Sequence, residues 1–114
     1  MAALLIGGTA SATDEYPSKV VSIVAGYPAG GALDVFARAL AEQLSAEMRQ
    51  SFIVDNKPGA SESIAAQIVS RAKPDGHTLL ISTQAPLTQN QFLFKKLSYN
   101  PVGCCRFHRH FVKV

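Results

Sequence analysis

A glycine-rich loop is the segment of this sequence with the clearest chemical potential. Residues 26–31 (GYPAGG) follow an apolar, β-branched run and precede a segment with helical spacing. A helix amino terminus offers backbone N–H groups that have no intrahelical acceptor, and glycines let an anion approach them closely. The loop therefore predicts a carboxylate or phosphate site near Gly30 and Gly31. The alternative is a tight strand-to-helix turn that holds no ligand.

The same loop raises a second possibility, the phosphate-binding turn of a dinucleotide-binding enzyme. Gly26, Gly30 and Gly31 do not have the G-x-G-x-x-G spacing of that turn. Asp55, at the end of the next predicted strand, does stand where such folds place a ribose-binding acid. A fragment of a dinucleotide-binding, Rossmann-like enzyme therefore stays open as an alternative, and the glycine spacing argues against it.

Other candidate chemistry is weak. Cys104, Cys105, His108 and His110 lie close together, but adjacent cysteines lack the C-x₂₋₄-C spacing of structural zinc sites. The sequence has no nucleophile elbow and no HExxH motif. We therefore expect no metal, no cofactor and no catalytic residue, which predicts a binding protein rather than an enzyme.

Three short apolar runs are the predicted strands that position the loop. They cover residues 20–25, 52–54 and 78–82, and each is followed by a segment that cannot continue a strand. Continuously apolar strands joined by helices predict a parallel sheet covered on both faces. Right-handed crossovers would place every strand-to-helix loop at one edge of that sheet, where such folds bind ligands.

The predicted helices alternate with these strands. Apolar residues recur at helical spacing over residues 33–44 and 64–69, and residues 86–97 can make a third helix with Phe92 and Leu93 on its apolar side. The order is β-α-β-α-β-α, which is an α/β fold.

Length and charge exclude several classes of protein. The chain has 114 residues, enough for one small domain. Its net charge of +3 comes from Arg106, Arg109 and Lys113 near the carboxyl terminus, and the rest carries equal numbers of acidic and basic residues. No predicted helix has a basic stripe, so we expect no nucleic-acid partner. No apolar run approaches the roughly 20 residues of a membrane-spanning helix.

The first residues have the character of an export signal. Leu4, Leu5 and Ile6 form a short apolar run, and Ala10-Ser11-Ala12 fits the small-x-small rule for signal peptidase. No basic residue precedes Lys19, so residues 1–12 are interpreted as the end of a longer signal peptide.

Several ordered motifs resemble the Bug-type solute-binding proteins of tripartite tricarboxylate transporters. They are YPSK at 16–19, YPAGG at 27–31, VDNKPGA at 54–60, PDGHTLL at 74–80 and YNPV at 99–102. The resemblance implies a periplasmic protein with two α/β domains hinged around a cleft that closes on a small carboxylate solute. It also implies delivery to membrane transporter subunits. Residues 13–102 would form an incomplete first domain of this periplasmic-binding-protein-like fold.

The resemblance also implies two groups of ligand-binding residues. The backbone of the first loop would hold a ligand carboxylate, and the end of the third strand would supply hydroxyl and N–H donors. These residues are Ala29, Gly30, Gly31, Ser82 and Thr83. Asp34, in the first turn of the first predicted helix, is expected to brace the loop rather than to touch an anion.

Two positions near the predicted site depart from the family pattern. The family usually has two glycines after P-G-A, whereas this chain has Ser61 and Glu62. A carboxylate at Glu62 would repel an anionic ligand unless it points to solvent. Gly26 stands where the family more often has proline.

Residues 103–114 depart from the family entirely, and we interpret them as an unrelated, frameshifted tail. On this view the chain is the amino-terminal part of a receptor and binds solutes weakly at best. A non-functional product of a damaged gene is the further alternative. The unpaired sheet edge also predicts self-association.

Overall fold

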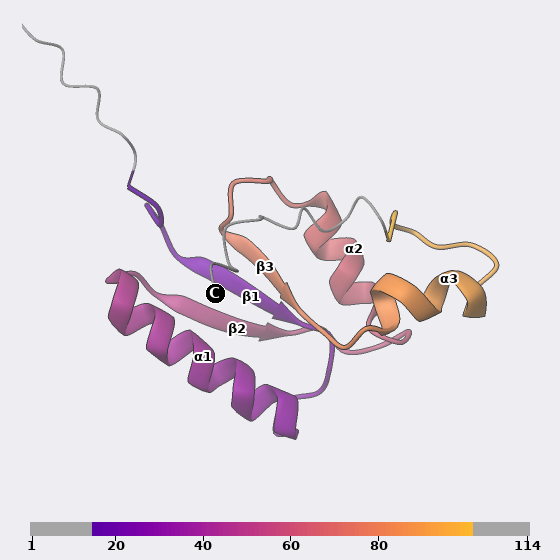
Figure 1. Ribbon diagram of the computed structural model, residues 1–114, viewed down its shortest axis with the longest axis horizontal. Coiled ribbons are helices and arrows are strands. Elements are labelled where there is room, and N and C mark those ends of the chain that lie inside the picture. Colours follow the sequence, from indigo (N-terminus) through magenta and orange to yellow (C-terminus); the bar gives the residue numbers. More distant parts are fainter. Residues whose placement is uncertain (1–14, 102–114) are drawn as a thin grey trace, which may run out of the picture.

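The three predicted strands form one parallel sheet with the order β2-β1-β3 (Figure 1). The computed structural model describes residues 15–101, so the predictions for residues 1–12 and 103–114 lie outside it. The strands are β1 (Val21–Ala25), β2 (Phe52–Asn56) and β3 (Thr78–Ile81). Their register pairs Ala25 with both Asn56 and Ile81, so the carboxyl ends of all three strands meet at one edge.

Two helices cover opposite faces of this sheet. Helix α1 (Ala32–Met48) packs on β1 and β2, and helix α2 (Ser63–Arg71) packs on β3 and β1. The chain moves from β1 to β2 in one direction and from β2 past β1 to β3 in the other. Right-handed crossovers in opposite directions put the two helices on opposite faces, as Figure 1 shows. The predicted α/β fold is confirmed.

The core lies between α1 and the sheet. Its buried members are Val21, Ile23, Ala41 and Phe52. Partly buried side chains complete it: Leu44, Met48, Val54, Leu79 and Ile81. Because side chains alternate along a strand, Val24 faces the other way and is buried on the side of α2, whose Ala65 and Ala66 are fully buried.

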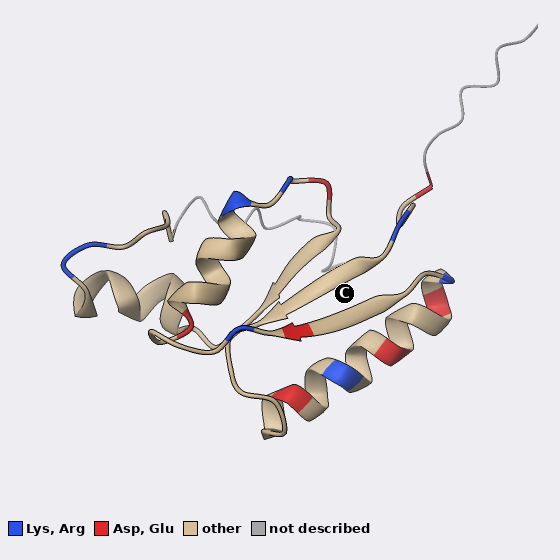
Figure 2. Cartoon of the chain, turned by 180° about the vertical axis from the view of Figure 1, so that it is seen from behind, with Lys and Arg blue, Asp and Glu red and all other residues tan. Residues whose placement is uncertain are grey.

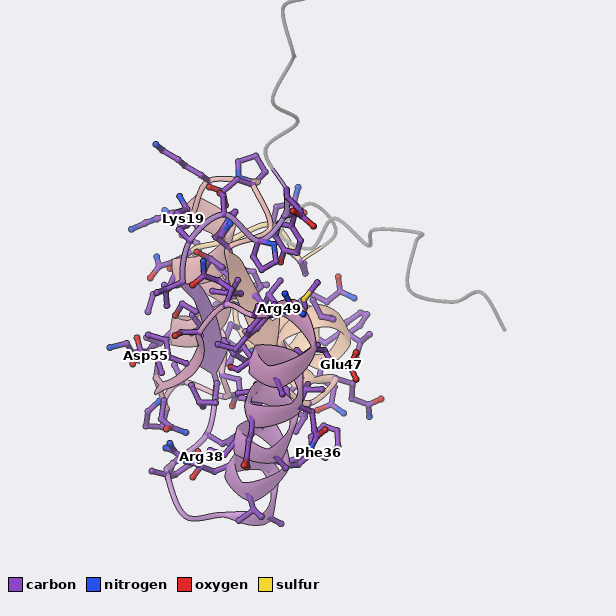
Figure 3. The ribbon with its side chains drawn as sticks, turned by 90° about the vertical axis from the view of Figure 1, so that its left-hand side faces the viewer. Lys19, Phe36, Arg38, Glu47, Arg49 and Asp55 are labelled. Atoms are coloured by element: carbon purple, nitrogen blue, oxygen red, sulfur yellow. The ribbon has the colours of Figure 1, made fainter. Side chains whose placement is uncertain are left out.

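The apolar stripe of α1 is wider than the surface that the sheet offers it. Ala37 and Ala41 are buried, whereas Phe36 is 60% exposed and Leu33 is 42% exposed. Phe36 and Arg38 project from opposite sides of α1 in Figure 3. The helix packs on the sheet through the small Ala37 and Ala41 and, nearer its end, through the partly buried Leu44 and Met48.

The prediction of a third helix over residues 86–97 is wrong in its extent. A single π-helical turn, η1 (Ala85–Gln89), leads into a short helix, α3 (Asn90–Leu93), and Phe94 is extended. Phe92 is 84% exposed and Leu93 is 68% exposed. α3 packs mainly against η1, so no sheet surface supports the apolar side that the spacing predicted.

Charged residues are mixed along the described part of the chain. Figure 2 shows acidic and basic residues interspersed along α1, without a basic stripe. Within residues 15–101 no helix is long and apolar enough to cross a membrane, and no three His, Cys, Asp or Glu residues gather into a metal-binding group. The cysteines and His108 and His110 lie outside that range.

Candidate functional site

Three loops meet at the carboxyl edge of the sheet. They are residues 26–31 after β1, 57–62 after β2 and 82–84 after β3. In a parallel sheet of order β2-β1-β3, the connection after β1 leads to one side of β1 and β3 lies on the other side. Folds of this type bind ligands at this switch point between β1 and β3. The backbone N–H of Gly26 donates to the carbonyl of Ile81 over 3.3 Å, which joins the two strand ends there.

Asp34 holds the first loop in place. One carboxylate oxygen accepts hydrogen bonds from the backbone N–H of Gly30 and from Nε of Arg38, each at 2.9 Å. The other accepts from Nδ2 of Asn56, also at 2.9 Å. The hydrogen bond from Arg38, then those from Gly30 and Asn56, lower the pKa of Asp34 to about 2. The carboxylate is therefore saturated by the protein and charged at neutral pH.

Tyr27 and Asn56 fix the same loop from the sheet side. The buried Tyr27 hydroxyl donates to the carbonyl of Leu33 over 3.2 Å, and Nδ2 of Asn56 donates to the carbonyl of Tyr27 over 3.2 Å. Burial raises the pKa of Tyr27, and the negative charges of Glu62 and Asp34 raise it further. Tyr27 therefore stays a neutral hydrogen-bond donor.

A shallow depression of about 230 Å³ lies where this loop enters α1. It is lined by Tyr27, Pro28, Gly31, Ala32 and Leu33. Val35 makes the first hydrogen bond to the cap residue, from its N–H to the carbonyl of Gly31 over 3.1 Å. The amides of the first helical turn therefore have no carbonyl of their own helix to bind. The amide of Gly30 is different, because it already donates to Asp34.

The donors at the end of β3 are also engaged. The backbone N–H of Thr83 donates to one carboxylate oxygen of Glu62 over 2.8 Å, and the Thr83 hydroxyl donates to the other over 2.7 Å. The Ser82 hydroxyl donates to the carbonyl of Thr83 over 3.0 Å. Glu62 thus turns toward the site instead of pointing freely to solvent.

The structure brings both predicted groups of ligand-binding residues to the same edge of the sheet. The segments 29–31 and 82–83 follow the neighbouring strands β1 and β3. Their contact with a ligand stays a prediction. Sequence reasoning missed Asn56 as a partner of the first loop, although its place at the end of a strand beside β1 is a signal for it. It also missed Thr83 as the partner of Glu62.

Comparison with known proteins was consistent across sequence and structure. The family described as the tripartite tricarboxylate transporter family receptor matches residues 36–106. A UPF0065 protein of Bordetella bronchiseptica is 40% identical, over 85% of this chain and 29% of the relative. Protein BugT of Bordetella pertussis is 34% identical, over 75% of this chain and 27% of the relative. The chain spans under a third of the relatives it matches.

Solved structures give the same result. The periplasmic binding protein BugD superposes with a TM-score of 0.68 at 36% identity, over 75% of this chain and 28% of BugD. An R. palustris protein solved with adipate superposes with a TM-score of 0.73 at 34% identity, over 77% of this chain and 29% of that one. Both the sequence and the fold of the aligned segment are thus similar to those of receptors of this kind. The chain belongs to the tripartite tricarboxylate transporter receptor family, among its Bug-type members.

Proposed function

We propose that this chain forms one side of an extracytoplasmic binding site for a small carboxylate solute, which the receptor passes to membrane transporter subunits. The observation that carries the proposal is the open first turn of α1 at the β1/β3 switch point. Its amides have no acceptor in their own helix, and the loop before it is fixed by Asp34. Such amides suit a carboxylate, because their partial positive charge favours an anion.

The relatives support the chemical class of the solute. Solved structures of similar chains carry adipate in one R. palustris protein and malate in MatC of Rhodopseudomonas palustris. Family members are receptors that bind solutes, which leaves the dinucleotide-binding alternative without support of its own. Asp55, the acid on which that alternative depended, pairs with Lys57 over 3.2 Å and is about half exposed.

Weak binding by this chain alone is part of the proposal. The relatives bind through a protein more than three times as long as the aligned segment. A carboxylate that reaches only the amides of Gly31, Ala32 and Leu33 lacks enclosure, and its hydrogen bonds compete with water. We therefore expect dissociation constants in the millimolar range, about 4 kcal/mol of binding free energy at 1 mM.

Amide chemical shifts test this proposal directly. Titration of the isotope-labelled chain with adipate and malate should move the amides of Gly31, Ala32 and Leu33 and leave those of α2 in place. Hexane-1,6-diamine at equal ionic strength, which has no carboxylate, is the matched control. If neither acid moves the resonances of these three amides, the proposed carboxylate site is contradicted. Micromolar affinity would contradict the expectation that one side of the cleft is insufficient.

A further inference from the structure

The Glu62 carboxylate already occupies donors at the ligand edge. Thr83 gives it two hydrogen bonds, one from the backbone at 2.8 Å and one from the hydroxyl at 2.7 Å. Two donors aimed at the two oxygens of one carboxylate make an anion-binding geometry, and here the chain supplies the anion. A solute carboxylate would need Glu62 to leave before it could use Thr83.

The backbone around Glu62 is held in an uncommon conformation. Ala60, Ser61 and Glu62 have φ angles of 47°, 50° and 65°, in the left-handed region that residues other than glycine rarely adopt. Glu62 is the amino-terminal cap of α2, yet its side chain makes no capping hydrogen bond. The carboxylate instead reaches Thr83, 21 positions further along the chain. The Glu62 carboxylate is therefore used to bind Thr83 and not to cap the amides of α2.

Gly26 makes the space that the Glu62 side chain fills. A Cβ atom at position 26 would lie 2.7 Å from Cβ of Glu62 and 2.8 Å from its Cγ, closer than such atoms pack. Gly26 is the first residue after β1, and its backbone is joined to β3. The Glu62 side chain is therefore wedged between the ends of β1 and β3, at the switch point itself.

No basic side chain within residues 15–101 forms an ion pair with Glu62. The ion pairs of that range involve Asp34, Asp55 and Asp75. In the part of the chain that the structure describes, the oxygens of Glu62 accept side-chain and backbone hydrogen bonds from the uncharged donors of Thr83. A carboxylate without an ion-pair partner repels an approaching anion and attracts a cation.

We propose that Glu62 is a specificity-determining residue: by occupying Thr83, it makes this end of the site accept a cationic group and exclude a second carboxylate. The inference rests on the proposed function and deepens it. A solute with one carboxylate at α1 and an ammonium group at its other end fits both ends of the edge. A dicarboxylate of the same length meets Glu62.

The test reads the Thr83 amide by nuclear magnetic resonance on the full chain. Sodium acetate and methylammonium chloride are the probes, with sodium chloride at equal ionic strength as the control. In the parent chain, methylammonium should move the Thr83 resonance and acetate should not. In Glu62→Gly, which suits the left-handed φ, acetate should bind at Thr83 at least about tenfold more tightly and methylammonium should have no effect.

Glu62→Gln is the matched variant, because it keeps the size of the side chain and removes its charge. Its amide oxygen accepts from the Thr83 backbone, and its amide nitrogen donates to the Thr83 hydroxyl. It should lose the methylammonium response and still exclude acetate. The proposal is overturned if acetate moves the Thr83 resonance equally in the parent chain and in Glu62→Gly, or if it moves that resonance in neither protein. It is also overturned if Glu62→Gln keeps the methylammonium response. The amides of Gly31 and Ala32 report separately on the proposed function, since they should respond to acetate in all three proteins.

A double-mutant cycle checks the packing on which the inference depends. Gly26→Ala should destabilise the parent chain by about 1–3 kcal/mol, because the new Cβ overlaps the Glu62 side chain. In the Glu62→Gly background the same change should be nearly neutral. Urea unfolding measures both. Equal destabilisation in the two backgrounds would show that Glu62 does not fill the space beside Gly26, and would overturn the proposal on structural grounds.

Discussion

Two carboxylates stand at the ligand edge of this sheet, and the chain uses them in opposite ways. Asp34 is 3% exposed and forms an ion pair with Arg38, and its carboxylate accepts hydrogen bonds from Gly30 and Asn56. Glu62 has no ion-pair partner in the described range, and it holds Thr83 instead. Both residues carry an acidic side chain, so residue type alone does not separate their roles. Their surroundings make one a structural brace and the other a charge presented to the solute.

Acid titration should show how much the Asp34 carboxylate contributes to the stability of the fold. Hydrogen bonds lower the pKa of Asp34 to about 2, and those from His77 and then Lys19 lower the pKa of Asp75 to about 2. The unfolded chain therefore binds protons at higher pH than the folded one. The stability that the Asp34 and Asp75 carboxylates contribute is fully present above about pH 4 and is lost as the pH falls toward 2. The free energy of unfolding, measured by urea titration at each pH, should fall over that window.

Two isosteric variants separate the roles of these acids. Asp34→Asn and Asp75→Asn should each flatten the acid limb, because each removes one group that titrates there. Only Asp34→Asn should also speed hydrogen exchange at the Gly30 amide, which loses its charged acceptor. Equal exchange at Gly30 in the two variants would contradict the bracing role of Asp34.

The short turn formed by η1 and α3 holds the loop that carries Glu62. Asn90 in α3 is fully buried, and its Nδ2 donates to the carbonyl of Ser61 over 2.8 Å and to the hydroxyl of Ser63 over 2.9 Å. The Tyr99 hydroxyl donates to the carbonyl of Pro86 over 2.6 Å and closes the turn. An element of four residues is thus tied to the start of α2 by polar contacts rather than by an apolar face.

Asn90→Ala should therefore weaken the fold more than its small size suggests. The change removes the donor of two hydrogen bonds, to the Ser61 carbonyl and to the Ser63 hydroxyl, at a fully buried position, and we expect a loss of about 1–3 kcal/mol. Gln91→Ala, in the same turn but exposed, is the control and should change stability by under about 0.5 kcal/mol. Urea unfolding compares them. A loss no larger than that of Gln91→Ala would refute this role of Asn90.

The same elements show where prediction from sequence succeeds and where it stops. The strands follow from apolar runs, and the first two helices follow from apolar spacing. Burial accounts for only part of the helical spacing, because Ala37 and Ala65 are buried whereas Phe36 is exposed. The predicted third helix is too long. Phe92 and Leu93 have the spacing of an apolar helix side, but they are exposed and pack on no sheet surface. The partner of Glu62 was not predictable, because the contact requires three consecutive left-handed residues and a glycine in another loop.

At the scale of the whole molecule, the sheet leaves apolar surface on an edge strand. In the described range β2 pairs only with β1, and α2 covers β1 and β3. Ile53 of β2 is consequently 52% exposed beside an edge with unpaired backbone groups. Edges of this kind join to other edges, and the one charged residue of β2, Asp55, lies near the carboxyl end of the strand and pairs with Lys57.

We therefore expect the chain to self-associate through β2, and two substitutions locate the contact. Ile53→Lys places a charge on the edge strand and should raise the dissociation constant of the assembly by about tenfold or more. Phe36→Lys removes an equally exposed apolar group from α1 and should leave association unchanged. Sedimentation velocity over a range of concentrations measures both. Dissociation by Phe36→Lys alone would move the interface to α1, and a parent chain that stays monomeric would contradict self-association altogether.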